Sequence, residues 1–268
     1  MAQKIDTAGL PVIELGVRRN SLHPWIFRKM VRTPKKGLPP GTLVTVVTRE
    51  GEFIGRGIYN PSRPVAIRLL TELESDRLDR AFFRTRLAEA KRLREETLSI
   101  PEISDSYRLM HGEADGLSGL IIDKYADVFV IEPYSAGYLT VMDWLADDLR
   151  ELYPGAKVAV RPDTKQAERE DVLGPFTEIA RRFPIPDSVT IREHHMRMKI
   201  NFKSGHKTGY FLDQRDNRRA VSTMAAGKTV LDLFCYTGGF SISAALGRAA
   251  SVTGVDLDEK SLKMAEEN

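Results

Sequence analysis

The 268-residue sequence predicts a multidomain fold with a small β-barrel, an α+β domain and the opening of a doubly wound α/β sheet. Three patterns support this prediction. Short β-branched segments with glycine and proline turns fill residues 1–74, and a long charged helical segment followed by strand-like runs fills residues 75–187. From residue 188 to residue 268, strand-like and helical segments alternate, which is typical of an α/β sheet.

The first part is rich in strand signals. Residues 42–48 are β-branched and lie between Gly41 and the turn 49–51, and residues 53–59 follow as a partner strand. Residues 65–70 form a further strand-like run. Strands this short, separated by glycine and proline turns, predict a small barrel or sandwich.

The middle part combines a helix with several strands. Residues 78–98 carry apolar side chains at helical spacing, and Pro101 ends the segment. A second helix is predicted over residues 138–152. The predicted strands are residues 107–110, 120–123, 128–132 and 157–161.

The third part begins with a predicted hairpin, residues 189–202, around His194 and His195. Asp213 is the predicted N-cap of a helix over residues 214–224 that ends at Gly227. Residues 229–235 form a near-continuous apolar run, which predicts a buried parallel strand. A helix over residues 240–246, a strand over 251–256 and a helix from 259 complete a β-α-β-α order.

A glycine pair, Gly238 and Gly239, lies where the apolar strand turns into the next helix. Glycines here permit a tight turn and close approach of a ligand to the backbone. Asp256 ends the next strand, at the spacing of an acidic residue that holds ribose hydroxyls, and Asp258 is its competitor. The loop lacks the G-x-G-x-x-G spacing that binds a pyrophosphate. It therefore favours S-adenosylmethionine, which has no phosphate, over a nicotinamide dinucleotide; a structural turn without a ligand is the alternative.

Five stretches of the chain resemble a known family. The runs GHKTGYFLDQRDNRR (205–219) and LDLFCYTGGF (231–240) resemble the bacterial and archaeal large-subunit 23S rRNA cytosine-C5 methyltransferases. Residues 113–125 also resemble that family, and residues 23–27 and 55–61 resemble its N-terminal PUA domain. The resemblance implies a PUA-like β-barrel, an α+β middle domain and the N-terminal part of a Rossmann-like class I methyltransferase domain, with S-adenosylmethionine as cofactor.

The resemblance also implies that the segment before the first α/β strand closes over the cofactor. A glutamine amide or an arginine guanidinium suits the methionine carboxylate. On the residues alone, the favoured interpretation is that Asp213 is only a helix cap and Arg215 only a surface cation. The predicted cofactor contacts are Tyr210, Gln214, Arg215, Asp232, Phe234, Tyr236, Thr237, Gly238, Gly239 and Asp256.

The catalytic nucleophile is not identified in the sequence. Methylation of a pyrimidine at carbon 5 needs a thiolate that adds at carbon 6. Cys235 is the only cysteine, and its place at the end of an apolar strand predicts a small core residue. In the family that the chain resembles, the catalytic cysteine follows a later Asp-Pro-Pro motif. The nucleophile is therefore expected beyond Asn268, and the chain is expected to be part of a longer protein.

The net charge is +3, so the distribution of cations matters more than their sum. Basic and aromatic residues alternate near the N-terminus, and Trp25 and Phe27 are expected in the core of the β-domain. The predicted RNA contacts are Arg18, Arg19, Lys29 and Arg56, which Arg63 and Arg68 could extend. Arg215, Arg218 and Arg219 recur at helical spacing and face either RNA or solvent.

Several classes are disfavoured. No apolar run is long enough to span a membrane and no secretory signal is present, and a single cysteine fits a cytoplasmic protein. His194, His195 and His206 lack further ligands at metal-binding spacing, so no metal is predicted.

The predicted function is methyl transfer to a base of 23S rRNA, with cytosine C5 favoured over uracil. The alternatives are an RNA-binding protein with a non-catalytic or incomplete Rossmann-like domain and a nicotinamide-dependent oxidoreductase; a homodimer stays open.

Overall fold

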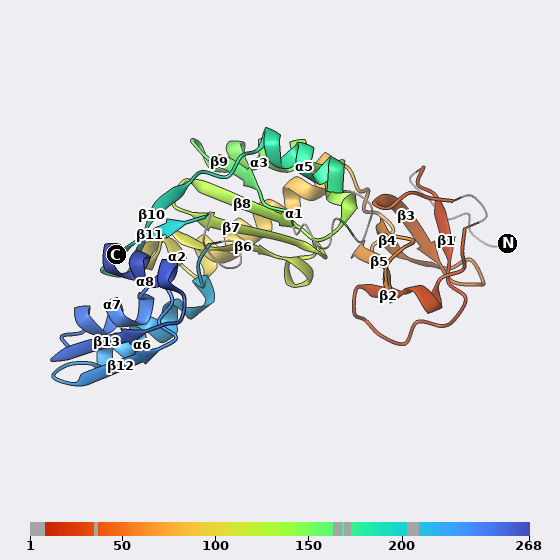
Figure 1. The fold of residues 1–268 in the computed structure, drawn as a ribbon. Coiled ribbons are helices and arrows are strands. Elements are labelled where there is room, and N and C mark those ends of the chain that lie inside the picture. Colours follow the sequence, from red (N-terminus) through yellow and green to blue (C-terminus); the bar gives the residue numbers. More distant parts are fainter. Residues whose placement is uncertain (1–8, 35–36, 163–167, 169–172, 203–208) are drawn as a thin grey trace. The chain divides into compact units, whose positions relative to one another are not determined.

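The computed structural model describes residues 9–34, 37–162, 168, 173–202 and 209–268 (Figure 1). The chain divides into two compact units. Unit 1 comprises Met1–Arg92, Met110–Ile122 and Ile131–Pro184, and unit 2 comprises Leu93–Leu109, Asp123–Val130 and Ile185–Asn268. No helix in these described ranges is both long and apolar enough to cross a membrane.

Unit 1 contains a five-stranded sheet in the order β1-β3-β4-β5-β2. Strands β3, β4 and β5 pair antiparallel, as the sequence predicts, while β1 pairs parallel to β3. Ile13, Ile26, Val44 and Ile67 form part of its core. The strands are β1 (Val12–Glu14), β2 (Trp25–Phe27), β3 (Thr42–Val47), β4 (Phe53–Tyr59) and β5 (Val65–Thr71).

The backbones of β4 and β5 approach so closely that β4 requires glycine. A Cβ atom at Gly57 would lie 2.1 Å from the carbonyl oxygen of Arg68, and one at Gly55 would lie 2.5 Å from that of Thr71. Backbone atoms cannot move aside as a flexible side chain can. These two glycines therefore serve strand pairing rather than a turn.

Arg56, between the two glycines, is fully buried. Its guanidinium donates hydrogen bonds to the carbonyl oxygens of Glu74, at 2.8 Å, and of Asp76. It also lies 5.1 Å from the centre of the Phe53 ring. The predicted RNA contact is therefore wrong for Arg56, because its charge is used inside the domain.

The middle of the chain forms a four-stranded sheet in the order β6-β7-β8-β9, with helices α1, α3 and α5. The helix predicted over residues 78–98 is α1 followed by a π-helical turn, Leu93–Thr97. Helix α5 was not predicted. The elements are α1 (Arg80–Arg92), α2 (Ile100–Ile103), β6 (Ser106–His111), β7 (Leu120–Tyr125), β8 (Val128–Pro133), α3 (Met142–Leu152), β9 (Lys157–Val160) and α5 (Leu173–Arg182).

Unit 2 carries the predicted hairpin and the predicted β-α-β-α order. Strands β10 and β11 pair antiparallel, and β12 and β13 pair parallel. The elements are β10 (Ser188–Glu193), β11 (Met196–Asn201), α6 (Arg215–Met224), β12 (Thr229–Leu233), α7 (Gly239–Leu246), β13 (Ser251–Val255) and α8 (Glu259–Glu267).

Helix α6 differs from its prediction at its N-terminal end and ends at the predicted residue, Met224. Asp213 lies in a short 3-10 turn, Leu212–Gln214, and the N-cap is Gln214, whose side chain caps no backbone group. The helix ends at Met224 with Ala225 as its C-cap, before Gly227. The 3-10 turn therefore makes the entry to α6, and the predicted cap by Asp213 is wrong.

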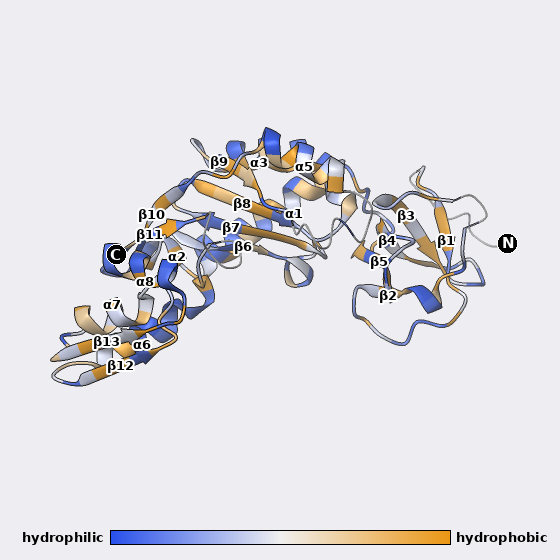
Figure 2. Ribbon diagram, viewed as in Figure 1, coloured by the Kyte–Doolittle hydropathy of each residue, from blue (hydrophilic) through white to orange (hydrophobic). Residues whose placement is uncertain are grey.

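The core of unit 2 lies around the hairpin rather than around β12. Tyr125, Val130, Met198, Ile200 and Phe202 are buried together in one cluster. Figure 2 shows hydrophobic residues along β12 and β13 as well. In this two-stranded sheet, however, Leu231 is 62% and Leu233 is 58% exposed. The expectation of a buried strand is therefore wrong for β12, because within the described chain only β13 pairs with it.

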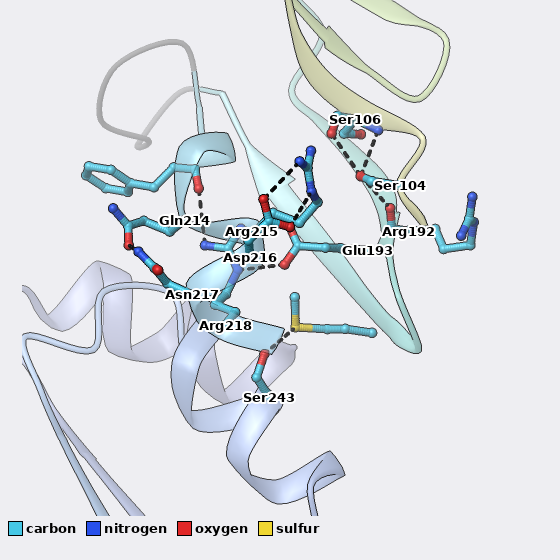
Figure 3. A network of polar contacts seen from close by, with 12 residues as sticks. Ser104, Ser106, Arg192, Glu193, Gln214, Arg215, Asp216, Asn217, Arg218 and Ser243 are labelled. Atoms are coloured by element: carbon cyan, nitrogen blue, oxygen red, sulfur yellow. Dashed lines mark hydrogen bonds and ion pairs between the residues drawn. The ribbon is translucent and has the colours of Figure 1, made fainter. Parts of the chain in front are cut away.

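A buried ion pair joins β10 to α6 (Figure 3). Glu193 and Arg218 have side chains that are 2% and 3% exposed, and Arg218 Nε and Nη2 each lie 2.6 Å from a Glu193 oxygen. Arg218 Nη1 donates to the carbonyl oxygen of Phe211 at 3.1 Å. The guanidinium also lies 4.5 Å from the centre of the Tyr210 ring. Arg218 thus faces neither RNA nor solvent, and the corresponding prediction is wrong.

Glu193→Ala is expected to lower the free energy of unfolding by roughly 3–5 kcal/mol, because it leaves the Arg218 charge buried without its partner. The measurement is urea denaturation followed by circular dichroism. The matched control is Glu267→Ala, which removes an exposed partner 3.1 Å from Lys199 and should cost under about 1 kcal/mol. Equal losses of unfolding free energy in the two variants would contradict a larger contribution of the buried pair to stability.

Candidate cofactor-binding site

The loop between β12 and α7 has an unusual backbone. Phe234 and Tyr236 adopt left-handed conformations with φ of 60° and 51°, and Gly238 follows with φ of 82°. A non-glycine residue in this region costs about 1–3 kcal/mol and is kept only where its surroundings impose it. Such strain gathers at functional sites. The sequence indicated the glycine but not the two strained aromatic residues.

Hydrogen bonds to β13 hold this loop in place. The Cys235 amide donates to the carbonyl oxygen of Val255 at 3.0 Å, and the Tyr236 amide donates to Asp256 Oδ2 at 2.8 Å. The Gly238 amide returns to the carbonyl oxygen of Cys235 at 2.9 Å. The end of β13 therefore fixes the shape of the glycine turn.

Asp256 and Asp258, the two candidates for holding the ribose hydroxyls, have different hydrogen-bond partners in the structure. Asp256 accepts backbone N–H groups of Asp258, at 3.0 Å to Oδ1, and of Tyr236. These bonds lower the pKa of Asp256 below its usual value, so the carboxylate stays charged. Asp258 instead caps α8, accepting from the Lys260 amide at 3.1 Å and the Ser261 hydroxyl at 2.7 Å. Asp256 is thus the aspartate that contacts the strained loop, and each oxygen retains a lone pair for a further donor.

Gly239 has a neighbour that explains why it lacks a side chain. A Cβ atom there would lie 2.6 Å from the hydroxyl of Tyr210. Tyr210 is 3% exposed, and burial raises the pKa of its phenol well above the usual value, so the hydroxyl remains a donor. The glycine pair therefore makes room for a buried phenol from the segment before α6.

Two buried polar atoms in this region lack partners among the residues that the structure describes. They are the hydroxyl of Tyr210 and Oγ1 of Thr237. An unpaired buried hydroxyl costs about 1–3 kcal/mol, so a polar ligand that bonds to both would stabilise the site. The donor set fits a small polar ligand with a carboxylate and ribose hydroxyls.

The other predicted contacts are placed less directly. Gln214 Oε1 accepts a hydrogen bond from the side-chain Nδ2 of Asn217 at 2.9 Å, and Arg215 pairs with Asp216 at 3.3 Å. Asp232 accepts from the Ser241 hydroxyl at 2.6 Å, in the first turn of α7. Phe234 is 81% exposed. Contacts between these four side chains and a cofactor remain predictions.

Cys235 has the environment of a core residue. It is 6% exposed, and burial, followed by the charges of Asp232 and Asp256, raises the pKa of its thiol. A thiol with a raised pKa carries little thiolate at neutral pH. The expectation that Cys235 fills space agrees with this environment.

The basic residues near the N-terminus have several environments. Arg18 and Lys29 are exposed, and Arg18 and Arg19 line a surface pocket of about 930 Å³. Arg19 pairs with Glu72 at 2.6 Å. Arg68 lies 3.2 Å from Glu113, so part of its charge is balanced.

The aromatic residues of β2 do not form the expected core. Phe27 is 43% exposed, and the half-buried Trp25 donates its indole N–H to Glu113 at 2.8 Å. Ile26, between them, is fully buried. Alternate strand residues point to opposite faces, so burial of Ile26 turns both neighbours outward.

The histidines at the hairpin tip also differ from each other. His195 is exposed, but His194 has φ of 51° and a buried Nε2 without a hydrogen-bond partner among the described residues. His194 is therefore not simply a solvated side chain, although the tip of a hairpin would ordinarily make it one. His206 lies outside the described residues. Among the described residues, no three His, Cys, Asp or Glu side chains are grouped to hold a metal ion.

Family models match both ends of the chain. Residues 18–72 match a PUA-like domain, and residues 180–268 match an S-adenosylmethionine-dependent methyltransferase domain. The chain is also similar to proteins named ribosomal RNA large subunit methyltransferase I. It is 36% identical to the protein from Klebsiella pneumoniae subsp. pneumoniae over 246 residues, covering 92% of the chain and 61% of the relative. For the Escherichia coli O9:H4 protein the identity is 35%, over 92% of the chain and 62% of the relative. The chain thus spans about three-fifths of the length of these relatives.

Solved structures support the fold. A provisionally assigned SAM-dependent methyltransferase from Streptococcus mutans superposes with a TM-score of 0.72 at 21% identity, covering 96% of this chain and 66% of that one. A methyltransferase of the same provisional kind, solved with S-adenosylhomocysteine, gives 0.71 at 22% identity over 96% of this chain and 65% of that one.

The matches confirm the predicted fold class and favour S-adenosylmethionine over the nicotinamide alternative. The chain therefore carries a region similar to a PUA-like domain, followed by a region similar to an S-adenosylmethionine-dependent methyltransferase domain.

Proposed function

We propose that the protein transfers a methyl group from S-adenosylmethionine to carbon 5 of a cytosine in 23S rRNA, in the cytoplasm. The observation that carries the proposal is the strained loop before α7, held by Asp256 and facing the hydroxyl of Tyr210, which has no partner among the described residues. Ribosomal RNA as substrate is supported by the names of the relatives.

The chain's own groups have distinct parts in this proposal. The cofactor, when bound, supplies an electrophilic methyl group on its sulfonium. Asp256 accepts hydrogen bonds from the ribose hydroxyls, and Gly238 and Gly239 let the backbone approach the ligand. Tyr210 donates to the methionine carboxylate, with Arg215 nearby as a countercharge. The remaining predicted contacts are Gln214, Asp232, Phe234, Tyr236 and Thr237.

The nucleophile for attack at carbon 6 is not assigned to Cys235, since its thiol is buried and has a raised pKa. We assign the positioning of RNA to residues 1–74 and 75–187 and the binding of cofactor to residues 188–268. Within the first part, Arg18, Arg19 and Lys29 are the proposed phosphate contacts.

The proposed reaction is tested with the longer protein that is expected to carry the nucleophile, S-adenosylmethionine tritiated on its methyl group and an unmodified 23S rRNA transcript. Label in 5-methylcytidine after digestion to nucleosides is the expected result. Label in 5-methyluridine would contradict the choice of base. Binding of cofactor and RNA without transfer of label would favour the second candidate, an RNA-binding protein with a non-catalytic or incomplete methyltransferase domain.

Asp256→Asn is expected to weaken binding of S-adenosylhomocysteine about tenfold or more, because a charged acceptor of the ribose hydroxyls is lost. Asparagine keeps one oxygen for the Tyr236 amide. Isothermal titration calorimetry gives the dissociation constant. Asp258→Asn makes the same charge change two residues away. It should alter the affinity less than about twofold, because a surface substitution outside the site usually has a small effect. An equal loss in both variants would argue against a ribose role for Asp256.

Tyr210→Phe is expected to act in opposite directions on stability and on binding. Loss of a buried hydroxyl without a described partner should leave the free protein unchanged or more stable by about 1 kcal/mol. Affinity for S-adenosylhomocysteine should fall about fivefold to tenfold, because one donor to the ligand is lost. Thermal unfolding and calorimetry check the two effects. Unchanged affinity would remove Tyr210 from the cofactor site.

A further inference from the structure

A pocket in unit 2 lies away from the glycine loop. Its volume is about 510 Å³, in the range of small-molecule sites. The hairpin tip, α6 and the second half of α7 line it, together with Glu102 and Ile103 of α2. Neither the loop before α7 nor Asp256 takes part in its lining.

The pocket is built on fixed backbone. The His194 amide donates to the carbonyl oxygen of Ile103 at 2.6 Å, and Arg192 Nη2 donates to that of Pro101 at 2.8 Å. On the other side, the Ser243 hydroxyl contacts the sulfur of Met196 at 3.8 Å (Figure 3). Segments distant in the sequence are therefore joined around this pocket before any ligand is present.

One wall is apolar. Met196 is buried, and Ile103 and Leu246 lie beside it, with Leu246 52% exposed. Thioether and aliphatic groups make good contact with a flat aromatic ring. This wall suits a nucleobase better than a sugar or an ion.

The polar lining of the pocket includes one cation that can pair with an anion. Arg219 lines the pocket and is exposed, as is Glu102, whereas the carboxylate of Glu193 is already neutralised by Arg218 at 2.6 Å. Burial, and next the charge of Arg219, lower the pKa of His194, so its ring is neutral at neutral pH. His194 Nε2 is buried and lacks a partner among the described residues.

We propose that this pocket binds a nucleoside monophosphate unit of single-stranded RNA. The base lies against Met196 and Leu246, His194 Nε2 bonds to the edge of the base, and Arg219 pairs with the phosphate. The choice of RNA as the source rests on the proposed function, while the nucleotide chemistry rests on the lining of the pocket.

The bound unit is a neighbour of the methylated nucleotide, not the target itself. Leu246 is seven residues beyond Gly239 on α7, which is roughly 10 Å along the helix axis. A base at that distance from the glycine loop is out of reach of a methyl group held there.

The test measures binding of a fluorescein-labelled single-stranded RNA oligonucleotide and, separately, of cytidine 5′-monophosphate. Arg219→Gln and His194→Asn are each expected to weaken binding about tenfold. Asparagine tolerates the left-handed backbone at position 194. Arg197→Gln is the matched control, since Arg197 is an exposed arginine on β11 that does not line the pocket.

Loss in the two pocket variants with near-normal binding by Arg197→Gln supports the site. If the oligonucleotide and the free nucleotide both show this loss, the pocket accepts either source; if only the oligonucleotide does, the source is an RNA strand. Wild-type affinity in Arg219→Gln, or an equal loss in Arg197→Gln, overturns the proposal. Titration of S-adenosylhomocysteine into the same variants should be unchanged, so failure of this site is distinguishable from failure of the cofactor site.

Discussion

The ion pair between Glu193 and Arg218 is the contact on which the arrangement of unit 2 depends. Removing two charges from water is costly, and attraction alone rarely compensates. Here the geometry supplies more than attraction, because two nitrogens meet two carboxylate oxygens at 2.6 Å and a third meets a carbonyl oxygen. Such a pair tolerates few alternative positions of β10 relative to α6. Its main effect is therefore to select one arrangement of these two elements.

The position of the cofactor loop follows from that pair. Arg218 lies between the rings of Tyr210 and Phe240, at 4.5 Å and 5.9 Å. Phe240 is in the first turn of α7, and the Tyr210 hydroxyl lies where a side chain of Gly239 would be. The hairpin, the entry to α6 and the glycine turn therefore form one connected set of contacts. A substitution in the hairpin should therefore change the position of the loop, even though the two segments are distant in the sequence.

The local part of this structure could be predicted from sequence, and the non-local part could not. The β-α-β-α order follows from the spacing of apolar residues and from the glycine pair, which act over a few residues. The burial of Arg56 and Arg218 depends on carbonyl and carboxylate groups that other segments supply. Charge patterns alone show such arginines as surface cations. Strand β2 has only three residues, too few to show an alternating pattern, so the outward turn of Trp25 and Phe27 was not predicted.

The exposed sheet of β12 and β13 also has a colloidal consequence. Leu231 and Leu233 of β12, and Leu257 just after β13, present apolar surface to water, the last at 94% exposure. Among the described residues no further strand pairs with β12 or β13. Edges of this kind recruit other strands, and the net charge of +3 offers little repulsion between copies. Charged substitutions at Leu231 and Leu233 should therefore raise the solubility of this polypeptide more than the same charges elsewhere on its surface.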